Sequence, residues 1–165
     1  MQASYLFYDI ETTGINPCFD QIIQFAAIRT DLALNEIERV EFRASISEDV
    51  IPHPAAMLVC NILPSEQQGN ASEYELVRQI HDLVNQPNMT SLGYNTLGFD
   101  DEFLRFAFYR HLLDPYTHQY NNGCGRMDIF PMAVMYYLFK PDVVQWPTVD
   151  GKRSLKLELL NNDNK

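Results

Sequence analysis

The sequence predicts a single domain with an α/β layer fold, and three observations support this prediction. Three strand-like segments come before the first helical pattern, another short strand separates two helical patterns, and the later part of the chain is again helical. With 165 residues the chain has the size of one ordinary domain and can bury a core. Its 46% hydrophobic and 21% charged residues are close to globular averages.

The first three predicted strands lie near the start of the chain. Residues 5–8 form an apolar aromatic run typical of a buried strand, and residues 21–29 form a second candidate. From Val40 to Ile46 apolar residues alternate with polar ones, which indicates a half-exposed strand. The connections between these segments are short, so we expect an antiparallel meander.

The helical patterns begin after residue 71. Ser72 is a good N-cap for a helix whose apolar stripe covers residues 76–84. A short strand is then predicted at residues 90–94, and a second helix at residues 100–111.

The last third of the chain is expected to be a loop followed by two helices. Residues 113–125 are rich in Tyr, Asn and Gly and predict a long loop. Asp128 can cap a third helix, in whose first turn Pro131 is tolerated. Ser154 can start a final short helix.

The net charge of −10 bears on the class of function. A stand-alone nucleic-acid binder usually carries a basic face that neutralises phosphates. An enzyme that holds its substrate through divalent cations can be acidic, because each ion reverses the local field. The charge therefore weakens the binding-module hypothesis more than the nuclease hypothesis, and it excludes neither.

Hydropathy and cysteine content predict a cytoplasmic protein without a membrane anchor. No stretch approaches the roughly 18 to 20 apolar residues of a membrane span, and residues 1–4 lack the features of a signal peptide. Cys18, Cys60 and Cys124 are widely spaced, so we expect free thiols in a reducing compartment.

Two carboxylates continue the first predicted strand, where a core strand would normally stay apolar. Residues two apart on a strand point to the same face, so Asp9 and Glu11 are expected to project together while Ile10 packs on the other side. Such like charges repel, and a hard divalent cation such as Mg²⁺ relieves the repulsion. The alternative interpretation is a strand end that has reached solvent and carries ordinary surface acids.

A second polar motif spans residues 93–100, between the predicted strand and the next helix. Its last residue, Asp100, is either a further metal ligand or a helix N-cap. The adjacent Asp101 is interpreted as an acid of the first helical turn, where the helix dipole favours negative charge.

Together these motifs resemble the first two signatures of the proofreading-type 3′→5′ exonucleases, the DEDD superfamily named for its four acids. The first signature is Asp-x-Glu-Thr at a strand end, and the second is Asn-x-x-x-Phe-Asp before a helix. Within this superfamily the chain is most similar to the exodeoxyribonuclease I family, and the similarity runs through residues 7–12, 24–31, 92–95, 99–102, 108–110, 114–116, 146–147 and 154–158.

The resemblance implies a ribonuclease H-like fold, with flanking helices and a mixed sheet made of an antiparallel meander and a parallel strand. It implies a DNA-repair enzyme that degrades single-stranded DNA from the 3′ end and releases mononucleotides by two-metal-ion hydrolysis. Asp9, Glu11 and Asp100 are the implied catalytic metal ligands for two Mg²⁺ ions, for which Mn²⁺ can substitute. A monomer is expected, with single-strand DNA-binding protein as a further partner through regions that this sequence lacks.

The resemblance also implies residues that contact the DNA. Lys156 stands where the family places an arginine near the terminal nucleotide, and lysine lacks the planar fork of arginine. Aromatic side chains in a loop suit base stacking, although each tyrosine can also be an ordinary half-buried loop residue. The implied substrate-binding residues are Glu11, Thr12, Thr13, Asn95, Phe99, Arg105, Tyr116, Tyr120 and Lys156.

The sequence departs from the family pattern at its end. The family continues into a His-x-x-x-x-Asp motif on a further helix, then into SH3-like and helical domains, and none of these is found in residues 1–165. The four histidines present lie outside that motif and are interpreted as surface or structural residues: His53, His81, His111 and His118. A smaller departure is residues 61–63 (NIL), where relatives show Gly-Ile-Thr near the bound nucleotide.

A truncated exonuclease domain with weak or no activity is therefore the main expectation, because the implied general base contributes about 10²- to 10⁴-fold. One alternative is a non-catalytic remnant that binds nucleic acid or a protein partner. Another is a DEDD relative that trims short RNA or proofreads for a polymerase.

Overall fold

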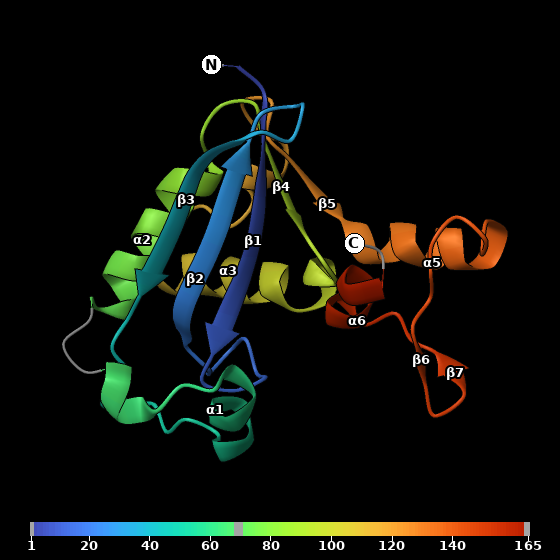
Figure 1. Ribbon diagram of the computed structural model, residues 1–165. Coiled ribbons are helices and arrows are strands. Elements are labelled where there is room, and N and C mark those ends of the chain that lie inside the picture. Colours follow the sequence, from blue (N-terminus) through green and yellow to red (C-terminus); the bar gives the residue numbers. More distant parts are fainter. Residues whose placement is uncertain (1, 68–70, 164–165) are drawn as a thin grey trace.

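A five-stranded mixed sheet organises the computed structural model, which describes residues 2–67 and 71–163 (Figure 1). The strand order across the sheet is β3-β2-β1-β4-β5. In chain order the strands are β1 (Ser4–Thr12), β2 (Ile22–Thr30), β3 (Glu36–Arg43), β4 (Met89–Gly93) and β5 (Gly125–Asp128).

The pairing confirms the predicted meander. β1 is antiparallel to β2 and β2 is antiparallel to β3, whereas β4 is parallel to β1 and β5 is parallel to β4. β3 begins earlier than predicted, at Glu36, and ends at Arg43. Val40 and Phe42 are its half-buried positions, as the alternation predicted. β5 was not predicted, because four residues after a turn-rich segment give no periodic signal.

Six helices accompany the sheet in the described part of the chain, with two short 3₁₀ helices and a small hairpin. The α-helices are α1 (Pro54–Cys60), α2 (Glu73–Val84), α3 (Asp100–Arg110), α4 (Thr117–Tyr120), α5 (Ile129–Phe139) and α6 (Leu157–Asp163). The 3₁₀ helices are η1 (Pro64–Gln67) and η2 (Thr96–Gly98), and the hairpin pairs β6 (Thr148–Val149) with β7 (Lys152–Arg153).

The main core lies between one face of the sheet and helices α2 and α3, which Figure 1 shows behind the strands. Tyr8 stacks on Phe25, and Phe25 in turn stacks on Phe42. Phe103 and Phe108 are fully buried on α3. These aromatic side chains bury large apolar areas, so they fix the angle at which α3 meets β1.

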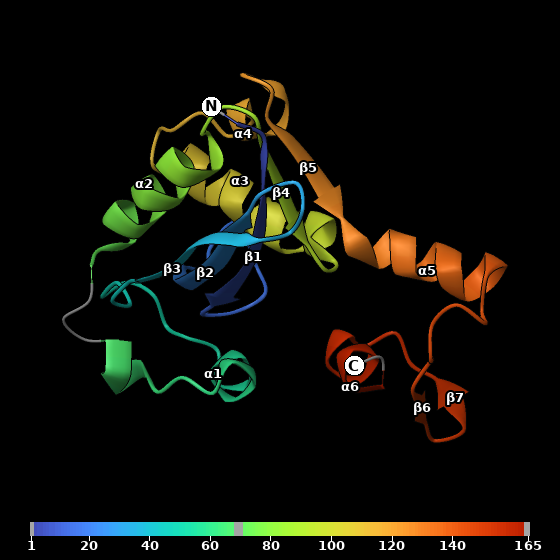
Figure 2. The ribbon, with the colours of Figure 1, turned by 45° about the horizontal axis from the view of Figure 1, so that its top comes forward.

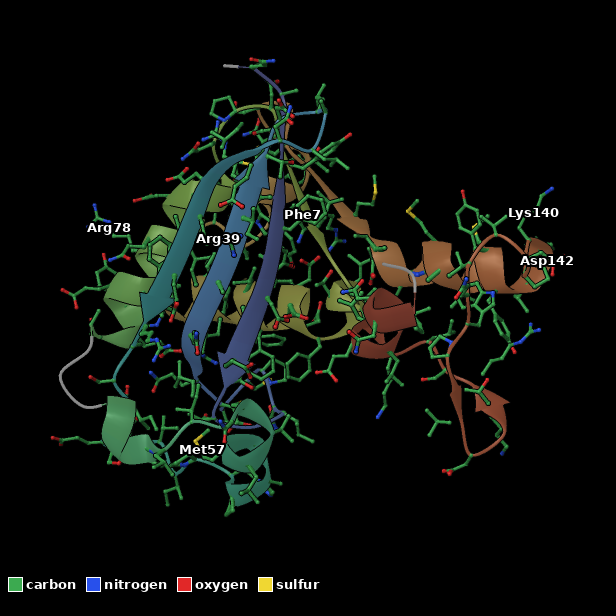
Figure 3. All side chains as sticks on the ribbon, viewed as in Figure 1. Phe7, Arg39, Met57, Arg78, Lys140 and Asp142 are labelled. Carbon is green, nitrogen blue, oxygen red and sulfur yellow. The ribbon has the colours of Figure 1, made fainter. Side chains whose placement is uncertain are left out.

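The opposite face of the sheet carries the polar positions of β1. Phe7 and Arg39 project from this face (Figure 3) and line a groove that also includes Asp9 and Ala26. Asp9 and Ala26 are exposed. The turned view shows that α5, the hairpin and α6 extend away from the sheet on the β5 side (Figure 2).

Two later predictions need correction. The predicted loop at residues 113–125 contains the one-turn helix α4. The final helix begins at Leu157 and not at Ser154, because the Ser154 amide bonds the Pro147 carbonyl at 2.7 Å and holds that residue against the hairpin. No helix in the described ranges has the length and apolar character needed to cross a membrane.

The predicted N-cap of α2 is confirmed and supports a stability prediction. Ser72 accepts a hydrogen bond from the Glu75 amide, and the Glu75 carboxylate accepts one from the Ser72 amide, which completes a capping box. We expect Ser72→Ala to cost about 1 kcal/mol and to lower Tm by about 3 °C in calorimetry. Gln79→Ala on the exposed face of α2 is the control. An unchanged Tm for Ser72→Ala would show that the box does not stabilise the helix.

Candidate active site where β1 and β4 part

The candidate site forms where the sheet splits. β1 pairs with β4 only from Ser4 to Phe7, although β1 itself continues to Thr12 alongside β2. Figure 1 shows β1 and β4 diverging beyond this point. The N-terminus of α3 fills the opening, because the Ile10 amide donates to Asp100 Oδ1 at 3.3 Å. A helical carboxylate thus occupies the place where the next strand would accept a hydrogen bond.

Asp9 and Glu11 lie on one face of β1, as the period of two predicted. Ile10 between them is buried in the core, whereas Asp9 is exposed and Glu11 is half-buried. The pKa of Asp9 is raised from its ordinary value by burial and by the negative charge of Glu11. Both acids lie inside the strand, so β1 does not end before them.

Asp100 is the most strongly perturbed acid of the site. It is 6% exposed, and burial together with the charge of Asp9 raises its pKa to about 7. The alternative interpretation of Asp100 as an N-cap is wrong, because Phe99 is the cap residue and Asp100 is the first residue of α3. Asp100 is therefore a buried acid of the first turn and not the residue that caps α3.

Glu11 points toward α1. Its carboxylate lies beside Cys60, whose thiol donates to the Thr12 carbonyl at 3.8 Å, and burial with the adjacent Glu11 charge raises the pKa of that thiol to about 11. Asp9 thus interacts with both other acids, whereas Glu11 also interacts with Cys60 of α1. Among the residues that the structure describes, no three His, Cys, Asp or Glu side chains are gathered closely enough to hold a metal ion as they stand.

The donor set nevertheless fits Mg²⁺ or Mn²⁺ in chemistry. All three candidate ligands, Asp9, Glu11 and Asp100, are carboxylates, and hard divalent ions prefer such oxygen donors. A cation between Asp9 and Asp100 would offset the negative charge of Asp9, which together with burial raises the pKa of Asp100. The role of the three acids as metal ligands stays a prediction, and Glu11 would take part by turning from Cys60.

Asp128 organises the turn between β4 and α3. Its carboxylate accepts hydrogen bonds from the amides of Asn95 (2.8 Å), Leu97 (3.2 Å) and Phe130 (2.9 Å). Asp128 therefore caps α5, as predicted, and also holds η2, which the sequence did not indicate. Asn95 has a positive φ of 64°, a conformation that asparagine tolerates better than most residues.

An apolar cavity of about 380 Å³ lies beside Glu11, between the end of β1 and α1. Phe99 closes one side of the cavity, and the ring centroids of Phe99 and Phe103 are 4.9 Å apart. α1, which forms one wall of the cavity, was not predicted, although Pro54 in its first turn and the His53 N-cap were available signals. The lining residues are Ile10, Glu11, Thr12, Gly14, Ile15, His53, Ala55, Ala56, Val59, Cys60 and Phe99.

The side chains of three residues predicted to contact DNA form hydrogen bonds or an ion pair within the chain. The buried Thr12 hydroxyl donates to the Gly14 carbonyl at 2.6 Å. The buried Thr13 hydroxyl accepts from the Gln21 amide at 2.9 Å. Arg105 forms an ion pair with Glu102 at 2.5 Å. Their roles toward DNA stay predictions.

Other predicted contacts come together in pairs. Arg105 also interacts electrostatically with Tyr116, which joins two of the implied DNA-binding residues. Tyr116 and Tyr120 flank α4 and are exposed. Asn95 and Lys156 line one open cavity beside α6, although they are distant in the sequence.

The histidines and cysteines have the structural character that the sequence predicted. His53 caps α1 through Nδ1. His118 is 1% exposed, and burial lowers its pKa to about 4, so it is neutral at pH 7. Cys18, Cys60 and Cys124 are free thiols.

Fold and sequence together define the class of this protein. Residues 6–143 match the protein family described as Exonuclease, so the chain belongs to the exonuclease family. The fold is ribonuclease H-like, as the resemblance implied. The carboxylates of β1 and of the start of α3 therefore lie in a domain of nuclease type.

The particular relatives are exodeoxyribonucleases I. The chain is 38% identical over 164 residues to Exodeoxyribonuclease I of Buchnera aphidicola subsp. Acyrthosiphon pisum (strain APS), which covers 98% of the chain and 40% of the relative. It is 37% identical over 166 residues to Exodeoxyribonuclease I of Escherichia coli (strain K12), covering 99% of the chain and 35% of the relative. A solved structure of Exonuclease I (apo) superposes with a TM-score of 0.95 at 37% identity, covering 99% of the chain and 37% of that structure. The chain thus spans less than half the length of these relatives.

Proposed function

We propose that this chain is an exonuclease domain that removes nucleotides from the 3′ end of single-stranded DNA by metal-assisted phosphodiester hydrolysis. The observation that carries the proposal is the buried Asp100 carboxylate beside Asp9 where β1 and β4 part. Solved relatives in complex with dA16 and dT13 oligonucleotides support single-stranded DNA as the substrate class.

Asp9, Asp100 and a reoriented Glu11 would hold the divalent cations. Bound Mg²⁺ or Mn²⁺ supplies activation of the attacking water and stabilisation of the leaving oxygen. Asp9 is exposed and so remains accessible to a phosphate from the open side of the sheet. Asp100 is buried, so its contribution is a fixed oxygen donor at the back of the site.

The cavity beside Glu11 is the proposed seat of the terminal nucleotide. Its mainly apolar lining and the ring of Phe99 suit the face of a base without reading its identity. Tyr116, the N-cap of α4, and Tyr120, its last residue, would stack on bases farther along the DNA strand. Arg105 would contact a phosphate once its ion pair with Glu102 is broken. Lys156 would meet the same strand from the α6 side.

Residues 1–165 alone are expected to hydrolyse single-stranded DNA slowly. The histidine-aspartate motif that the resemblance implies is not among these residues, and proton-transfer assistance is worth about 10²- to 10⁴-fold. A solved relative in complex with SSB-Ct supports single-strand DNA-binding protein as a partner of exonucleases of this family.

The decisive experiment follows release of label from a 3′-labelled single strand in Mg²⁺. We expect slow release that chelation stops and that Asp9→Ala abolishes, because this variant removes the acid between the other two carboxylates. Asp49→Ala, an exposed acid in a turn, is the matched control and should keep the wild-type rate. Release that Asp9→Ala leaves unchanged would refute the proposal.

A non-catalytic remnant that binds nucleic acid is the second candidate. The orientation of Glu11 toward Cys60 favours it, because the third carboxylate is not directed at the other two. Fluorescence anisotropy separates the two functions: binding of single-stranded DNA that ignores Mn²⁺ and Glu11→Gln would favour the remnant. Parallel assays with short RNA and with duplex ends would identify a relative with a different substrate.

A further inference from the structure

A buried hydrogen-bond cluster is formed by the chain neighbours of two candidate ligands, Asp9 and Asp100. Tyr8 precedes Asp9 on β1, and Asp101 follows Asp100 on α3. The Tyr8 hydroxyl donates to Asp101 Oδ1 at 2.5 Å, and Arg126 Nη1 donates to Asp101 Oδ2 at 2.7 Å. Tyr8 and Asp101 are only 6% and 3% exposed. The sequence placed Asp101 in the first helical turn, which is confirmed, but its side chain points into the protein.

The Asp101 carboxylate joins three separate elements at the point where the sheet offers least support. β1 and β4 no longer pair beyond Phe7, so the strand ladder does not fix α3 against the end of β1. The Ile10 amide bond to Asp100 is long, at 3.3 Å. The two bonds of Asp101 are shorter, and the bond from Arg126 joins a guanidinium to a carboxylate, which makes it roughly twice as strong as a neutral hydrogen bond.

Burial of Asp101 requires both of its partners. A carboxylate out of water is costly unless it is paired and hydrogen-bonded. Tyr8 and Arg126 satisfy one oxygen each, and Arg126 comes from β5. A shift of α3 along β1 would break these bonds, so the cluster limits how far Asp100 can move from Asp9.

We propose that Tyr8, Asp101 and Arg126 are positioning residues that hold Asp9 and Asp100 at a separation suited to a divalent cation. The inference rests on the proposed function, since it assigns a role within the same site. A cluster that only stabilises the fold would affect Tm and leave cation affinity unchanged. A positioning cluster affects cation affinity even where the fold is retained.

The test measures Mn²⁺ affinity of residues 1–165 by electron paramagnetic resonance of free Mn²⁺, with Tm measured in parallel. Partners behind metal ligands typically contribute about 10- to 100-fold to metal affinity, so we expect Tyr8→Phe to weaken Mn²⁺ binding about tenfold. Tyr109→Phe makes the same chemical change at an exposed position of α3 and should leave affinity unchanged. Arg126→Gln should weaken binding similarly, and Arg126→Lys should restore most of it, because lysine keeps the charge.

The outcomes separate the inference from the proposed function. Wild-type affinity in folded Tyr8→Phe and Arg126→Gln, alongside weakened binding in Glu11→Gln, would overturn the positioning role and leave the metal site intact. Absence of Mn²⁺ binding in the wild-type chain would overturn both. If Tyr8→Phe fails to fold, the Mn²⁺ affinity of Arg126→Gln tests the positioning role. Arg126 lies at the more exposed end of the cluster, so its substitution disturbs the core less.

Discussion

Asp9→Asn is expected to weaken Mn²⁺ binding by at least about a hundredfold, because loss of a ligand should match or exceed the upper end of the 10- to 100-fold effect of outer partners. Asp9 is the carboxylate that interacts with both Glu11 and Asp100. Its replacement therefore leaves these two acids without the carboxylate that links them. The change preserves side-chain shape, which limits the effect on folding. Isothermal titration calorimetry with MnCl₂ measures the affinity.

Asp49→Asn is the matched control for this substitution. Asp49 is an exposed acid in a turn, and the change also reduces the negative charge by one. It therefore reports the effect of net charge on cation binding, which the value of −10 makes appreciable. Equal affinities in Asp9→Asn and Asp49→Asn would place the cation somewhere other than the gap between β1 and β4.

Asp100→Asn is expected to stabilise the metal-free chain at pH 8 while removing a cation ligand. The pKa of Asp100 is about 7 in the folded chain against its ordinary value of 3.8. Stability from a group with a raised pKa is fully present below the unfolded value and is lost as pH rises through the folded value. The wild-type chain should therefore lose about 2 kcal/mol between pH 5 and pH 8, after allowance for relaxation of the buried site.

Calorimetry at both pH values tests this expectation. For a chain of this size the loss corresponds to about 5 °C in Tm, which Asp100→Asn should recover at pH 8. Mn²⁺ should recover it for the wild type and not for the variant. A wild-type Tm that is equal or higher at pH 8 than at pH 5, with no gain in Asp100→Asn, would show that Asp100 bears no unfavourable charge.

Much of this fold was accessible from local sequence pattern. The meander followed from apolar runs and alternation, and the capping box of α2 followed from Ser72. The shared face of Asp9 and Glu11 followed from the period of a strand. Elements without a period were missed or misplaced, such as the short β5 and the start of α6. Their positions depend on tertiary hydrogen bonds that no local window contains.

For the candidate site, the sequence pattern indicated residues more than geometry. Family resemblance predicts Asp9, Glu11 and Asp100 as ligands, which stays a prediction, and it did not indicate that Glu11 lies beside Cys60. Asp101 was interpreted as a helix-turn acid because sequence shows only its helical position. Its partner Arg126 is 25 residues away and meets it through the packing of β5 beside β4. Such pairings arise from topology and not from spacing.

Anomalous diffraction from crystals of this chain soaked in Mn²⁺ would test the metal assignment most directly. We predict a manganese peak bounded by the carboxylates of Asp9 and Asp100, with Glu11 turned away from Cys60 toward the ion. A peak elsewhere, or saturating Mn²⁺ with no density in the gap between β1 and β4, would contradict the account.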